Sequence, residues 1–183
     1  MDFKFSPEEQ ALRQEAYSFA RSRQGKNPRD LWVGSYHVDN REARGHLTEF
    51  ARGIAERGWW TMHWPTEYGG KGAPLSTQLA YREGMGLANA PLTLAGYEGD
   101  LVMRYGSEAQ KEFFLPGIAS GEIVDWSQGF SEPDSGSDLA SIQTRAVRDG
   151  NDYIVTGHKI WNSDALRADW GHYLVRTDQD APK

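Results

Sequence analysis

The chain of 183 residues contains no cysteine. Disulfides, thiolate metal sites and cysteine nucleophiles are therefore excluded, and the composition fits a reducing compartment. Long apolar runs are missing too, both in the first residues, MDFKFSPEEQ, and further along. The sequence accordingly predicts neither a signal peptide nor a membrane-spanning helix. We expect a cytoplasmic globular protein without a membrane partner.

The sequence also lacks an excess of positive charge. It has 20 Lys and Arg against 26 Asp and Glu, a formal net charge of −6. Binding of nucleic acid requires a basic surface, and no dense Lys/Arg cluster is present, so nucleic acid is not an expected partner. The five histidines show neither an HExxH motif nor another metal-binding spacing, and no metal site is predicted.

Several common catalytic and nucleotide-binding motifs are absent. No GxGxxG opens a βαβ unit, and no GxxxxGK[ST] loop occurs, so neither common phosphate-binding loop is available. A GxSxG elbow is missing as well, which leaves a serine nucleophile without support. Any function must therefore come from a different kind of site.

Helical signals occupy the first two thirds of the chain. Ser6 with Glu9, and Ser107 with Gln110, have the spacing of capping boxes that open helices. Apolar spacing predicts further helices over 41–56, 75–87 and 94–105. The Pro- and Gly-rich loop WPTEYGGKGAP is predicted to be irregular, and Pro116 is predicted to end the helix that begins after Ser107.

The apolar spacing changes to a period near two from Ile123 onward. Asp149 and Gly150 form a hairpin signal between two strand-like segments, and DWGHYLVRT is strand-like too. The predicted fold class is therefore α+β: an all-α domain over residues 1–121, then part of a β-sandwich or barrel-like domain over 122–183. With about four strand-like segments, this sheet would have exposed edges and little apolar face to bury.

The segment QGFSEPDSGSD, residues 128–138, lies where a strand ends. Its serines, glycines and backbone amides could wrap an anion such as a pyrophosphate, and the Ser131 hydroxyl suits the edge of a planar heterocycle. Glu132 and Asp138 would repel an anion, so we expect them to point away and brace the loop. By composition alone, a plain turn is the favoured interpretation of this segment.

The order of these residues resembles the signature of the acyl-CoA dehydrogenase family. In that family a Thr or Ser is followed by EP, two variable residues, GSD, a hairpin and G-x-K-x-W with a hydroxyl residue. The matching segment here is FSEPDSGSDLASIQTRAVRDGNDYIVTGHKIWNS. The helical part resembles the family in FSPEEQALRQEAYSFA, RGWWTMHWPTEYGGKG and YGSEAQKEFFLPGIASGE. These separated matches follow in order along nearly the whole chain.

The resemblance implies FAD as cofactor and assigns residues to it. The FAD-contacting stretch matches Gln128 through Ser137, and a second stretch matches Trp161, Asn162 and Ser163. The Ser131 hydroxyl would bond the flavin ring, and Ser137 would contact both FAD and the acyl-CoA substrate. The implied cofactor-binding residues are Gln128, Phe130, Ser131, Gly136, Ser137, Trp161, Asn162 and Ser163. Taken alone, Trp161 would be a core aromatic on a strand, and we expect the Trp126 and Phe130 side chains to be core residues.

The implied reaction is α,β-dehydrogenation of an acyl-CoA thioester, which makes the protein an oxidoreductase. An electron-transfer flavoprotein would accept the electrons, and the family forms homo- or hetero-oligomers, commonly tetramers. The family's C-terminal helical domain, which carries the catalytic base, has no counterpart here, so no catalytic residue is assigned. We expect a fragment that is inactive by itself. Two alternatives are a non-catalytic partner subunit and an acyl-CoA oxidase. The sequence of the loop resembles that of members acting on bulky or branched acyl groups.

Overall fold

The protein forms two compact units, Met1–Val124 and Asp125–Lys183, in a computed structural model. The first unit is helical and the second is built from strands, which confirms the predicted α+β fold class. The structure describes residues 4–23, 41–90, 95–162, 165 and 168–181. Within this part of the chain, no helix has the length and hydropathy needed to cross a bilayer.

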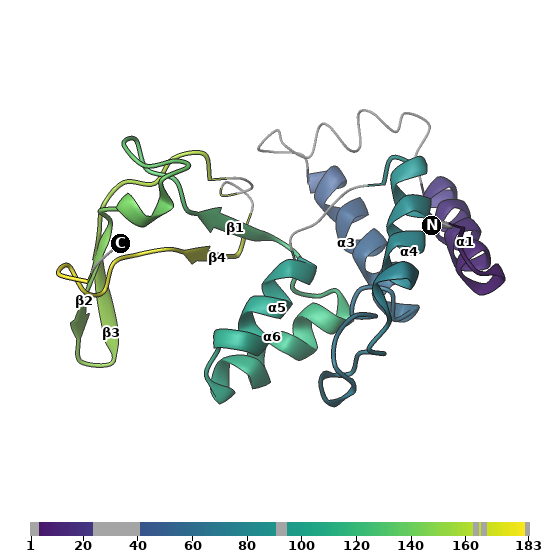
Figure 1. Cartoon of the computed structure of the whole chain (residues 1–183), viewed down its shortest axis with the longest axis horizontal. Helices are drawn as coiled ribbons and strands as arrows, with labels where there is room; N and C mark the ends of the chain where they lie inside the picture. The colour runs from purple at the N-terminus through teal and green to yellow at the C-terminus, as the bar shows by residue number, and fades with distance from the viewer. Residues whose placement is uncertain (1–3, 24–40, 91–94, 163–164, 166–167, 182–183) are drawn as a thin grey trace. The chain divides into compact units, whose positions relative to one another are not determined.

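The first unit is built mainly from helices (Figure 1). They are α1 (Pro7–Arg23), α3 (Arg41–Glu56), the 3₁₀ turn η2 (Thr66–Tyr68), α4 (Leu75–Leu87), α5 (Ala95–Tyr105) and α6 (Glu108–Ser120). The predicted helices over 41–56 and 75–87 are confirmed. Both predicted capping boxes are formed: the Ser6 amide donates to Glu9 at 2.9 Å, and the Ser107 amide donates to Gln110 at 2.9 Å.

Two predictions about this unit are wrong. The loop predicted to be irregular contains η2, which ends at Gly69 in the left-handed region, φ 82°. Pro116 does not end α6 but lies inside it, and the helix stops at Gly121, whose φ of 75° is left-handed. Leu115 and Ile118, on either side of the proline, are buried. Their burial offsets the hydrogen bond that proline cannot make.

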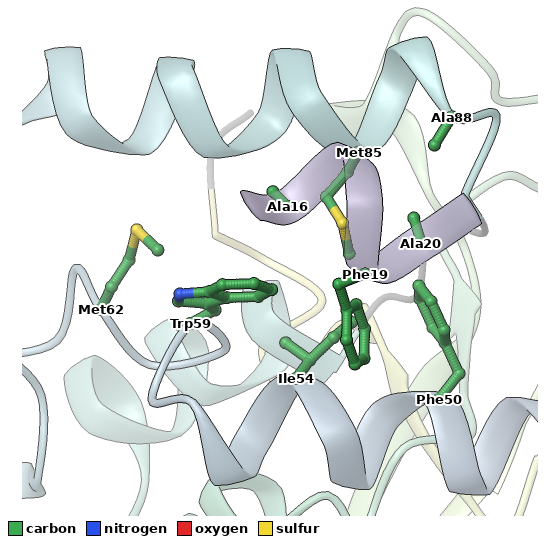
Figure 2. Packing of buried hydrophobic residues seen from close by; sticks show 9 residues of the cluster. All are labelled: Ala16, Phe19, Ala20, Phe50, Ile54, Trp59, Met62, Met85 and Ala88. Atoms are coloured by element: carbon green, nitrogen blue, oxygen red, sulfur yellow. The ribbon is translucent and has the colours of Figure 1, made fainter. Parts of the chain in front are cut away.

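Aromatic side chains form the centre of the helical core (Figure 2). Phe19 of α1 lies 5.4 Å from Phe50 of α3 and 5.5 Å from Trp59, measured between ring centroids, with the Trp59 ring perpendicular. The Arg57 guanidinium lies 4.5 Å from the Phe19 ring centroid. The same cluster includes Ala16, Ala20, Ile54, Met62, Met85 and Ala88. Helix α1 packs along α4 and thereby closes one side of this core.

The second unit contains two small sheets. Strand β1 (Trp126–Gly129) pairs in parallel with β4 (Trp170–Tyr173), and β2 (Arg145–Asp149) pairs antiparallel with β3 (Asp152–Thr156). The 3₁₀ turn η3 (Leu139–Ser141) precedes β2. The predicted hairpin is present, with Gly150 in the left-handed region at φ 61°. Its strands leave large apolar side chains exposed: Val147, Tyr153, Ile154 and Val155.

Candidate functional site

The polar loop after β1 is folded into a tight turn. The Glu132 amide donates to the Ser135 carbonyl at 2.8 Å, and the Ser135 amide donates back to Glu132 at 3.0 Å. Pro133 lies inside this turn, where its fixed φ suits a bend. Beyond it, Gly136 and Ser137 are exposed, and a Cβ added at Gly136 would meet nothing within 4 Å. The outer side of the loop therefore has room for a ligand.

The segment before Trp161 runs beside this loop. The Ile160 amide donates to the Ser131 carbonyl at 2.9 Å, which joins two segments that lie far apart in the sequence. The sequence assigned Ser131 and Trp161 to different stretches of one site. Backbone hydrogen bonding of Ser131 to Ile160 brings the ends of these stretches close together.

Trp161 is not a core residue, so the alternative of an aromatic on a buried strand is wrong. Its side chain is 84% exposed, and its φ of 58° is in the left-handed region. This backbone conformation is unfavourable for a bulky residue and is found most often where function requires it. An exposed indole held in this way offers a flat apolar face to a ligand.

The remaining assigned residues differ in burial and contacts. Asn162 is half-buried, and its buried Oδ1 atom has no hydrogen-bond partner among the described residues. Gln128, Phe130 and Ser131 are half-buried as well. Ser163 lies outside the described residues. The Trp126 side chain is buried, as predicted, whereas the Phe130 ring is half-buried and lies edge-on to His172 at 4.8 Å between centroids.

Glu132 braces the loop, as the sequence predicts. Its carboxylate accepts hydrogen bonds from the amides of Gln143 at 2.6 Å and Thr144 at 2.9 Å, and it meets Lys159 at 2.8 Å. Burial by itself raises the pKa of the Glu132 carboxyl, but the donors from Lys159, Thr144 and Gln143 outweigh it and bring the pKa down to about 2. Asp138 accepts a hydrogen bond from Ser141 and also braces the loop.

Two residues that hold the site were missed by sequence reasoning. Lys159 was part of the matched motif but received no role. Arg176 lies outside the matched motifs, yet its guanidinium donates to the carbonyls of Ala140 at 2.6 Å, Ile142 at 3.2 Å and Ala181 at 3.2 Å. Because these contacts depend on the fold, the only available signal was a basic residue at the end of a strand-like segment.

The chemistry of this site is that of binding and orientation. Within the described residues, no group of three or more His, Asp or Glu side chains could hold a metal ion. Burial lowers the pKa of His172, so this imidazole is predominantly neutral at pH 7. On its outer side the site presents the exposed residues Gly136 and Ser137 and the exposed indole of Trp161.

Models of two domains of one protein family match the chain. The acyl-CoA dehydrogenase N-terminal domain matches residues 6–122, and the acyl-CoA dehydrogenase middle domain matches residues 127–183. The chain belongs to the acyl-CoA dehydrogenase family. The family predicted from the motifs is therefore confirmed.

Similar proteins support this membership along the whole chain. Acyl-CoA dehydrogenase FadE26 of Mycobacterium tuberculosis is 36% identical over 186 residues, which span 99% of this chain and 45% of FadE26. The solved Tcur3481-Tcur3483 steroid ACAD is 35% identical with a TM-score of 0.81, covering 100% of this chain and 46% of that one. A glutaryl-CoA dehydrogenase of Mycobacterium smegmatis, solved in complex with FADH2, is 26% identical with a TM-score of 0.70 over 95% and 44%. The chain thus spans about half the length of these relatives.

Proposed function

We propose that this chain is the flavin-binding part of an FAD-dependent acyl-CoA dehydrogenase. One observation carries the proposal: the Ile160–Ser131 hydrogen bond holds the exposed Trp161 next to a polar loop whose outer side is open. The glutaryl-CoA dehydrogenase with the same fold was solved with FADH2. Membership of the family and this local geometry point to the same cofactor.

The residues present fit a flavin. An isoalloxazine ring is flat and carries donors and acceptors along its edge, which suits the exposed Trp161 indole and the Ser131 hydroxyl. The buried Asn162 Oδ1, which lacks a partner among the described residues, is available to accept a hydrogen bond. Gly136 and Ser137 would hold the phosphate-bearing part, because both residues are exposed and offer backbone amides and the Ser137 hydroxyl as donors. Gln128 and Phe130 would complete the stretch beside the ring.

When bound, FAD supplies the hydride acceptor for oxidation of a Cα–Cβ bond. The residues of this chain bind and orient: Trp161 would cover one face of the ring, and Ser137 would contact both cofactor and acyl-CoA. We assign the catalytic base to a part of the protein outside this chain, since the buried carboxylate of the loop, Glu132, is engaged by Lys159 and two amides. The 183-residue chain is therefore expected to be inactive alone.

We infer the substrate class and the partners of the whole protein from its similarity to relatives. The Tcur3481-Tcur3483 relative is called a steroid ACAD, and we propose a bulky acyl-CoA as the substrate class of the whole protein. An electron-transfer flavoprotein would reoxidise the flavin, and the protein would act as a homo- or hetero-oligomer. A partner subunit without flavin is the second candidate. The exposed Gly136 and Ser137 and the exposed Trp161 speak against it, because these residues lie outside the buried core.

The test is an FAD titration of the purified chain and of its Ser137→Ala variant. Ser137 is exposed, so this change should leave stability nearly unaffected and weaken FAD retention. In a longer natural form containing these residues, anaerobic addition of a bulky acyl-CoA should bleach the flavin absorption. A longer form that stays colourless with added FAD would support the partner-subunit alternative. Rapid reoxidation of the reduced flavin by oxygen would instead indicate an acyl-CoA oxidase.

A further inference from the structure

Two opposite charges are buried together beside the candidate site. The Lys159 ammonium lies 2.8 Å from a Glu132 carboxylate oxygen, and the two side chains are only 6% and 7% exposed. Removing charges from water costs free energy that their mutual attraction does not reliably recover. Stability alone therefore does not explain why this protein buries such a pair of charges.

Each charged group also binds backbone atoms of a different segment. Besides Glu132, the Lys159 ammonium donates to the Phe130 carbonyl at 3.0 Å. The Glu132 carboxylate accepts from two consecutive amides, those of Gln143 and Thr144. The pair thus connects the end of β1, the segment before β2 and the segment that leads to Trp161.

The pair lies between the two stretches assigned to the flavin. Lys159 is followed by Ile160, whose amide bonds the Ser131 carbonyl, and then by Trp161. Phe130 and Ser131 belong to the first stretch, and Trp161 opens the second. Neither charged side chain is exposed enough to meet a ligand, so their effect on the site must pass through the backbone.

We propose that Lys159 and Glu132 form a positioning clasp that fixes the distance between the Gln128–Ser137 loop and the segment beginning at Trp161. This inference rests on the proposed function, because the distance is important for a ligand that contacts both stretches. The clasp specifies a single arrangement. Lys159 reaches the Phe130 carbonyl, and Glu132 reaches two adjacent amides, only when the segments are in this register. An apolar pair would tolerate a shift of the segments.

Two variants test the clasp: one removes only the Lys159 charge, and the other removes both charges of the pair. Lys159→Met keeps the length of the side chain and removes its charge and donors. The double variant Lys159→Met with Glu132→Gln removes both charges, so that no uncompensated charge stays buried. Lys111→Met is the matched control, because Lys111 of α6 pairs at a similar distance, 2.9 Å, with Glu108, whose side chain is 83% exposed.

Two measurements are made on the 183-residue chain and its variants. Amide hydrogen exchange at Gln143, Thr144 and Ile160 reports the clasp itself and needs no cofactor. The dissociation constant of FAD and the shape of the bound flavin's visible spectrum report its effect on the site. In Lys159→Met we expect exchange at these amides to rise about tenfold or more and FAD affinity to fall about tenfold, with an altered spectrum. Lys111→Met should change neither.

The double variant keeps the proposal testable if Lys159→Met fails to fold. We expect it to fold and still to bind FAD about tenfold more weakly, because the bond to the Phe130 carbonyl is lost. Wild-type FAD affinity and spectrum in the folded double variant would overturn the positioning role. Unchanged exchange at Ile160 and Thr144 would overturn the clasp. Failure of the wild-type chain to bind FAD, with exchange responding as expected, would count against the proposed function and leave the clasp standing.

Discussion

Gly99 of α5 lies directly against the indole ring of Trp64. A Cβ built at Gly99 would overlap the Cζ2 atom of Trp64, with Cε2 and Cη2 at 3.0 Å. The indole has no room to retreat, since Trp64 is 0% exposed. We expect Gly99→Ala to lower the free energy of unfolding by about 1–3 kcal/mol, although alanine favours helix over glycine. Urea unfolding followed by circular dichroism measures this.

Gly86 of α4 provides the matched control. It is also helical, but a Cβ there would meet nothing within 4 Å. Gly86→Ala should therefore raise the free energy of unfolding by about 0.5–1 kcal/mol. Equal stabilities of the Gly99→Ala and Gly86→Ala variants would show that the contact with Trp64 is not as close as the structure has it.

Trp161 should be dispensable for folding and needed for the flavin. Glycine at position 161 would relieve the left-handed backbone, which costs about 1–2 kcal/mol for other residues, and little buried area would be lost from a side chain that is 84% exposed. We expect Trp161→Gly to leave the stability unchanged or slightly raised and to weaken FAD binding. Urea unfolding and a fluorescence titration with FAD measure the two effects.

Asn89 offers a control for the backbone effect. It is the other described non-glycine residue with positive φ, 54°, and it lies in the helical unit. Asn89→Gly should leave FAD affinity unchanged. If Trp161→Gly destabilises the protein strongly while FAD affinity stays the same, Trp161 has a structural role and its assignment to the flavin fails.

The variant Gly136→Ala tests the binding role of the loop without disturbing its folding. A Cβ at this position meets no neighbour and its φ is not in the left-handed region, so Gly136→Ala should change the free energy of unfolding by less than about 0.5 kcal/mol. If the loop holds the phosphate-bearing part of FAD, the added methyl group would keep the cofactor from the backbone, and FAD affinity would fall. Calorimetric titration measures this affinity. Full FAD affinity in Gly136→Ala would place the phosphates elsewhere.

The stability of the protein should depend on Glu132 at acid pH. Its folded-state pKa of about 2 lies below the ordinary value of 4.5, so the fold favours the ionised form. The resulting stabilisation is fully present above about pH 4.5 and is lost as the pH falls towards 2. For a shift of this size it amounts to about 3 kcal/mol. Unfolding by urea at a series of pH values should show the loss.

Glu132→Gln isolates this contribution because it cannot titrate. The difference in unfolding free energy between wild type and variant should be largest above pH 4.5 and shrink below it. His172, whose pKa is lowered by burial, also reduces stability in acid, starting from its ordinary value of 6.5, but it does so in both proteins. A difference that stays constant from pH 6 to pH 2 would contradict the assigned ionisation of Glu132.

Local signals in the sequence predicted the helical unit well, because each helix depends on its own caps and apolar spacing. The end of α6 was predicted wrongly. Pro116 is a strong local signal for the end of a helix, but burial of Leu115 and Ile118 stabilises the helix up to Gly121. Tertiary packing, which a local pattern does not contain, decided the end of α6.

The candidate site was predictable only as two separate stretches. The motif match identified residues around Ser131 and Trp161, but the hydrogen bond from Ile160 to Ser131 joins segments whose proximity is a product of the fold. For the same reason Arg176 was missed, since it binds carbonyls more than thirty residues away as well as a nearby one. The exposure of Trp161 could not be predicted from its residue type, because tryptophan is equally typical of a buried strand.

The parallel pairing of β1 with β4 has a consequence for synthesis of the protein. Gly129, at the end of β1, pairs with Tyr173, so β1 leaves the ribosome well before its partner exists. At about 5–20 residues per second, translation leaves this strand unpaired for several seconds. During that interval a nascent chain with finished helices would expose β1, including Trp126, which is buried in the folded protein. This strand is therefore the segment at which we expect a chaperone on the nascent chain to act.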